Sequence, residues 1–144
     1  MGDVVPAPGG PFSPLAIDHV VVRVRDMERA IEFYCDILGC VRERQVDELG
    51  LVQLRAGTSL VDLVDIAKPL GKAGGPPPGQ GGRNMDHFAL RIAPFDMAAI
   101  AAHLAAHGVE PGAPARRYGA EGMGPSIYIR DPDGNVVELK GPPD

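Results

Sequence analysis

The chain has 144 residues, a length that fits one domain, and 44% of them are apolar, which is ordinary for a globular protein. We therefore expect a core that removes on the order of two-thirds of the unfolded surface from water. The net charge of -5 and an isoelectric point near 5.3 exclude a general nucleic-acid binder, because such a protein presents a basic face. No stretch approaches the roughly 20 apolar residues that a membrane-spanning helix requires.

The N-terminal residues 1–15 are dense in Pro and Gly and lack periodicity, so we predict a flexible tail. They show neither the positive start nor the apolar segment of a secretory signal, and the cytoplasm is the expected location. The two cysteines, Cys35 and Cys40, are too few for a disulfide framework. We interpret them as small, buried or half-buried thiols.

The first structured half begins at residues 17–24, where β-branched side chains predict a buried strand. Asp26 is expected to cap a helix through residue 36, with apolar residues at i, i+3 and i+4 spacing on one face. Gly39 suits the left-handed position that ends a helix. Three further strands are predicted at about residues 40–47, 50–56 and 60–66.

A second half follows residues 67–84, whose Gly- and Pro-rich composition predicts a flexible connector, with a loop that covers a site as the alternative. We expect a strand at 85–92, a helix from Asp96 to Gly108, and strands near 113–118, 125–130 and 135–140. The expected organisation is one domain, residues 16–144. Its two modules are residues 16–66 and 85–141.

The two halves repeat each other in order and in chemistry. The matched residues are Asp18-His19 with Asp86-His87, Arg23 with Arg91, Asp26-Met27 with Asp96-Met97, and Asp62 with Glu138. Each half therefore reads β-α-β-β-β and carries one His on its first strand and one carboxylate on its last. The predicted fold class is α+β, with the two modules forming one cupped mixed sheet.

Strand alternation predicts where these polar residues point. On each half, apolar residues take the face toward the helix, and the His and the carboxylate take the reverse face. Lys140 shares that reverse face with Glu138. If the two halves form one curved sheet, His19, Asp62, His87 and Glu138 converge inside the cup as ligands for a first-row divalent ion. The alternative for each residue alone is a satisfied structural His or a solvated carboxylate.

The motifs that carry this pattern resemble the vicinal-oxygen-chelate superfamily, which includes glyoxalase I, bleomycin-binding proteins and extradiol dioxygenases. The resembling segments are IDHVVVRVRDMERAIEFYCDILGC (17–40), MDHFALRI (85–92) and SIYIRDPDGNVVELKG (126–141). The resemblance places His19, His87 and Glu138 at metal-ligand positions. Asp62 stands where glyoxalase-type members carry a Glu, so direct or water-bridged ligation is expected there.

The resemblance also implies one divalent metal ion (Zn, Ni, Mn, Co or Fe), a small-molecule substrate and a homodimer. Tyr128 falls where extradiol dioxygenases place a site tyrosine, with a packing role as the alternative. The leading hypothesis is a metal-dependent lyase or isomerase of the glyoxalase type, acting on a substrate with two neighbouring oxygens through an enolate or oxyanion. Glu138 or Asp62 would then move the proton.

Two arginines, Arg23 and Arg91, are predicted on the cup side, where they would bind a substrate carboxylate or else remain solvated. Two further functions stay open at this point. The first is a binding protein that sequesters a small drug or metabolite without turnover. The second is an extradiol-type dioxygenase, which would require iron.

Overall fold

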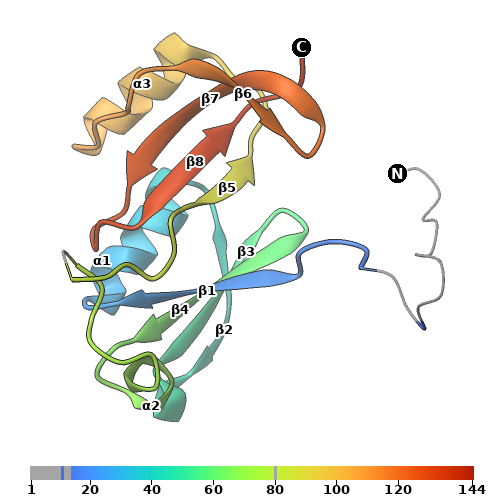
Figure 1. Ribbon diagram of the computed structural model, residues 1–144. Coiled ribbons are helices and arrows are strands. Elements are labelled where there is room, and N and C mark those ends of the chain that lie inside the picture. The colour runs from blue at the N-terminus through green and yellow to red at the C-terminus, as the bar shows by residue number, and fades with distance from the viewer. Residues whose placement is uncertain (1–10, 12–13, 80) are drawn as a thin grey trace.

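The computed structural model describes residues 11, 14–79 and 81–144, and these fold into two modules (Figure 1). Most of the predicted N-terminal tail lies outside the described residues. The first module carries the sheet order β1-β4-β3-β2, with β1 parallel to β4 and the other neighbours antiparallel. Its elements are β1 (His19–Val24), α1 (Met27–Ile31), η1 (Glu32–Ile37), β2 (Val41–Val46), η2 (Asp47–Leu49), β3 (Leu51–Ala56) and β4 (Ser59–Asp65).

The second module repeats this topology with the order β5-β8-β7-β6, in which β5 is parallel to β8. A short helix, α2 (Pro69–Lys72), lies in the connector between the modules. The remaining elements are β5 (Phe88–Arg91), α3 (Met97–Ala106), β6 (Ala115–Gly119), β7 (Gly122–Arg130) and β8 (Val136–Lys140). The predicted pair of β-α-β-β-β modules is confirmed.

Both main helices begin where the sequence predicts. The side chain of Asp26 accepts a hydrogen bond from the N–H of Arg29, and that of Asp96 accepts one from the N–H of Ala99. These bonds satisfy N–H groups that the first helical turn leaves without a partner. After α1 the helix continues as the π-helical segment η1, which the apolar spacing did not predict.

The connector differs from a plain flexible linker because side chains of the first module hold it. Arg23 donates from Nε to Asn84 Oδ1 at 2.9 Å, and from its two terminal nitrogens to the carbonyls of Gly75 and Pro76. Arg25 donates to the carbonyl of Pro78. The strand predicted at 85–92 is likewise shorter, since β5 begins only at Phe88.

A single core joins the modules, because the helix-facing sides of both sheets pack on the same cluster. Its members include Val22 and Leu63 of the first sheet, Ile127 and Leu139 of the second, and Tyr34 of η1. In Figure 1, α1 accordingly lies between the two sheets. Within one chain β1 and β5 are not hydrogen-bonded, so the predicted single cupped sheet is instead two four-stranded sheets.

None of the helices in the described part of the chain is both long enough and apolar enough to cross a membrane.

Candidate functional site

The first candidate half-site lies on the face of the first sheet that points away from the core. His19 begins β1, and Asp62 stands on the neighbouring β4, where it is only 5% exposed. His19 Nε2 lies 4.0 Å from Asp62 Oδ2. Two ligands of one ion at about 2.1 Å each can be separated by up to roughly 4.2 Å, so this pair is within reach of a shared metal ion.

The imidazole of His19 is oriented by the residue before it. Asp18 Oδ2 lies 2.8 Å from His19 Nδ1, which leaves Nε2 as the free nitrogen. A carboxylate on the far nitrogen is a common support for metal-binding histidines. The hydrogen bond with Asp18 and the charge of Asp62 raise the pKa of His19 above its ordinary value.

Gln53 completes the first half-site, and the sequence analysis did not identify it. Its Nε2 lies 3.2 Å and 3.1 Å from the two oxygens of Asp62. Gln53 is the cross-strand partner of Asp62, and residues directly opposite in a sheet share a face. Pairing β3 with β4 in the correct register would have revealed this contact from the sequence.

The second half-site repeats the first on the outer face of the second sheet. His87 lies immediately before β5, and Asp86 Oδ2 is 2.6 Å from its Nδ1. This contact with His87 holds the pKa of Asp86 below its usual value. Glu138, on β8, is 7% exposed and pairs across the sheet with Tyr128. Each half therefore offers one oriented imidazole and one buried carboxylate.

Tyr128 joins the members of the second half-site. Its ring meets that of His87 edge to face, with 5.2 Å between the centroids. Loss of solvent contact and the carboxylate of its cross-strand partner Glu138 raise the pKa of Tyr128 above its ordinary value. The tyrosine predicted at the site thus lies beside both candidate ligands of its module.

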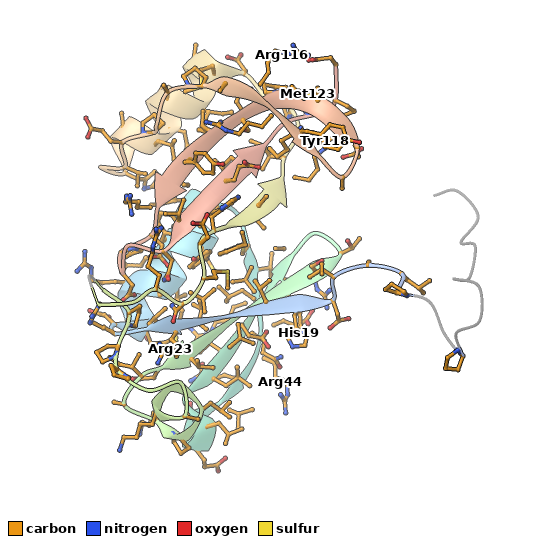
Figure 2. The ribbon with its side chains drawn as sticks, in the orientation of Figure 1. His19, Arg23, Arg44, Arg116, Tyr118 and Met123 are labelled. Carbon is orange, nitrogen blue, oxygen red and sulfur yellow. The ribbon has the colours of Figure 1, made fainter. Side chains whose placement is uncertain are left out.

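The two half-sites are not brought together within one chain. Among residues 11, 14–79 and 81–144, no group of three or more His, Cys, Asp or Glu side chains is arranged to hold a metal ion. The cause is the shared core, which turns the polar faces of the two sheets outward. Figure 2 shows His19, Arg23 and Arg44 on the side of the first sheet away from the second module.

The two arginines predicted to bind substrate have partners within the chain. Arg23 is held by the connector, as described above. Arg91 donates from Nε to Glu121 Oε1 at 2.6 Å and from Nη1 to the carbonyl of Ile92. Two other cations on the second polar face, Arg117 and Lys140, were not predicted as site residues, although alternation placed Lys140 on that face.

The fold and the paired half-sites define a two-module α+β protein with a repeated His and carboxylate. Residues 16–139 match the model of the family described as "Glyoxalase/Bleomycin resistance protein/Dioxygenase superfamily". The chain belongs to this family, which is the vicinal-oxygen-chelate superfamily that the sequence resembles.

Three relatives show the range of the family. A glyoxalase domain-containing protein, RDO1, of Mycosarcoma maydis is 33% identical over 131 residues, which cover 89% of this chain and 69% of that protein. Catechol-2,3-dioxygenase of Bacillus subtilis is 27% identical over 85% of this chain, but the match spans only 40% of that enzyme. The crystal structure of virulence protein STM3117 of Salmonella typhimurium superimposes with a TM-score of 0.70 and 28% identity, covering 90% of this chain and 98% of that one.

Proposed function

We propose that the protein is a metal-dependent lyase or isomerase of the glyoxalase I type, acting on a small substrate with two neighbouring oxygens. One observation carries this proposal. Each module presents an imidazole with a free Nε2, fixed through Nδ1 by the preceding Asp, on the same face as a buried carboxylate. Imidazole and carboxylate together suit first-row divalent ions, and His19, Asp62, His87 and Glu138 would hold one.

The complete site is proposed to form between two copies of the chain. Strands β1 and β5 are both free edges, and each carries the imidazole of its half-site at or beside its first residue. Apolar side chains near the β1 edge are exposed, with Ile17 at 74% and Val21 at 46%. Joining β1 of one copy to β5 of the other would cover these edges and bring the four ligands together.

The chemistry that a divalent ion supplies at such a site is Lewis-acid polarisation of the substrate oxygens. The residues of the chain would orient the substrate and move its proton. Glu138 is buried and is the cross-strand partner of Tyr128, so a proton taken from a carbon atom would pass to a carboxylate that has a tyrosine beside it. The paired sheets would exclude water from the reacting carbon.

An extradiol-type dioxygenase is the second candidate, and Gln53 is the observation that favours it. The amide of Gln53 occupies both oxygens of Asp62. If that bond persists in the assembled protein, His19, His87 and Glu138 remain as two histidines and one carboxylate, the pattern of non-haem iron oxygenases. The metal that is found and the effect of Asp62→Ala distinguish the two functions.

Metal content tests the proposed centre. The purified protein should hold about one divalent ion per chain by elemental analysis, and His87→Ala should lose it. His103→Ala is the matched control, because His103 lies on α3 and contacts the carbonyl of Ile37. Asp62→Ala should weaken metal affinity roughly 10- to 100-fold in calorimetry. Equal metal in wild type and His87→Ala would reject the centre. Iron together with unchanged affinity of Asp62→Ala would support the dioxygenase.

Mixing two inactive variants tests whether the site is shared. In a shared site, a dimer of one His19→Ala chain and one His87→Ala chain retains one intact pair of histidines. A statistical mixture should then recover about one quarter of the wild-type metal content, although each variant alone binds none. No recovery after subunit exchange, or a mass near 15.2 kDa by light scattering at micromolar concentration, would contradict the shared site.

A further inference from the structure

Lys140 is a buried cation whose ammonium group has almost no hydrogen-bond or ion-pair partners among the described residues. It stands two residues beyond Glu138 on the same face of β8 and is only 7% exposed. Its Nζ has a single, long contact of 3.4 Å to the carbonyl of Gly122. No Asp or Glu of the described residues lies within ion-pair distance of it. An ammonium removed from water is costly unless an anion or several hydrogen bonds receive it.

The β6–β7 hairpin makes room for this side chain. A Cβ atom on Gly119 would lie 3.2 Å from Lys140 Cε, and one on Gly124 would lie 2.9 Å from Nζ and 2.5 Å from the carbonyl oxygen of Pro142. Neither glycine has the positive φ that would require glycine for backbone reasons. The missing side chains therefore allow the ammonium to rest against the hairpin.

Arg117 provides a second cation beside the first. It pairs directly with Gly124 across the hairpin, so it lies next to the position that Lys140 Nζ occupies. Its Nη1 donates to Ser126 Oγ at 2.7 Å and to the carbonyl of Ser126 at 3.1 Å. The guanidinium carbon lies 4.4 Å from the centre of the Tyr128 ring. Arg117 thus contacts Ser126 and Tyr128, which are the cross-strand partners of Lys140 and Glu138.

Two of the three cations on this part of the face have no ion-pair partner among the described residues. Arg91, the cross-strand neighbour of Lys140, is paired with Glu121. Arg117 and Lys140 have no such partner in the described part of the chain. Glu138 lies on the same face about 7 Å along the strand, since successive residues of one strand face repeat at that spacing. The two cations without an ion-pair partner therefore lie beside the proposed reacting centre.

We propose that Lys140 and Arg117 form a subsite for the carboxylate of the substrate. The inference rests on the proposed function, and it names the substrate class as a small carboxylic acid with two neighbouring oxygens at its other end. The distance between the substrate carboxylate and its two neighbouring oxygens would match the length of a short dicarboxylate, since Lys140 and Glu138 stand about 7 Å apart along the strand. Lys140 contributes a point charge, and the planar guanidinium of Arg117 can form paired hydrogen bonds with a carboxylate.

Binding of succinate to the metal-depleted protein tests this subsite. Protein passed over chelating resin is titrated calorimetrically with sodium succinate at low ionic strength, because the subsite requires no metal. Wild type should show saturable binding, and Lys140→Met and Arg117→Met should each weaken it at least about tenfold through loss of a charge-assisted hydrogen bond. Lys140→Arg should retain affinity, and Lys72→Met, which removes an exposed charge from α2, should bind as wild type.

The outcomes separate the subsite from the metal centre. Absence of succinate binding in wild type, or equal binding by Lys140→Met and wild type, would overturn the subsite whatever the metal content proves to be. Inorganic phosphate binding more than tenfold tighter than succinate would overturn the assignment to a carboxylate. Circular dichroism melting verifies that each variant is folded. If Lys140→Met does not fold, Arg117→Met decides the question.

Discussion

Replacing Tyr34 with Phe should weaken the contact that joins the two modules. Tyr34 belongs to the first module and is fully buried, and its hydroxyl donates to Asp131 Oδ2 of the second module at 2.9 Å. Burial, followed by the charge of Asp131 and this hydrogen bond, raises the pKa of Tyr34 well above its ordinary value. The substitution removes one oxygen and leaves the ring, which stacks on Phe88 with 6.4 Å between centroids.

The magnitude follows from the partners of Asp131. A hydrogen bond to a charged group contributes about 1.5–3 kcal/mol to the free energy of unfolding. Asp131 is 5% exposed, so water does not readily replace the lost donor. It still accepts from the N–H groups of Asp133 and Asn135 and from the Asn135 amide. The remaining hydrogen bonds should preserve the turn at Asp131, and the expected decrease in the free energy of unfolding is therefore about 2 kcal/mol.

Equilibrium urea unfolding at pH 7 measures this loss, at one fixed protein concentration because the stability of any oligomer depends on concentration. Tyr118→Phe is the matched control, since Tyr118 is 80% exposed and a surface change should stay within about 0.5 kcal/mol. If Tyr34→Phe also stays within about 0.5 kcal/mol of wild type, the hydroxyl does not join the modules, and the reasoning fails.

Three further outcomes follow from local chemistry. Burial, followed by the neighbouring Cys35, raises the pKa of Cys40 to about 11; in a Cys35→Ser background burial alone should still make this thiol react with an aromatic disulfide at pH 8 at least about tenfold more slowly than an ordinary thiol of pKa 9.0. Folding raises the pKa values of Cys40 and Tyr34, so their contribution to the free energy of unfolding should be fully present below about pH 9 and should decrease as the pH rises above it. Urea unfolding at several pH values between about 8 and 10.5 measures this decrease. Asp96→Ala should cost about 0.5–2 kcal/mol in thermal melting, since the N–H of Ala99 loses its cap.

Local patterns in the sequence predicted the modules well because they depend on neighbouring residues. Asp26 and Asp96 were placed as caps from residue type alone, and both accept the expected N–H. The repeat aligned Asp62 with Glu138 as equivalent positions, and both carboxylates are buried on the polar faces of their sheets. Alternation along a strand is a local property, so it survives into the folded structure.

The arrangement of the two sheets could not be predicted in the same way. Alternation shows that His19 and Asp62 share a face, but it does not show what that face meets. Both modules bury their helix-facing sides against one another, and this choice depends on contacts such as Tyr34 with Phe88 that join distant parts of the chain. Convergence of the four candidate ligands within one chain was therefore an assumption about packing.

The two carboxylates of the proposed centre are equivalent in the repeat, but their different surroundings favour different roles. Asp62 is the shorter side chain, and the amide of Gln53 holds both of its oxygens. Glu138 is one methylene longer, and its cross-strand neighbour is Tyr128, whose hydroxyl can donate or accept a hydrogen bond. A proton shuttle must move between substrate and solvent, whereas a supporting ligand must stay in place. We therefore expect Glu138 to move the proton and Asp62 to fix the geometry.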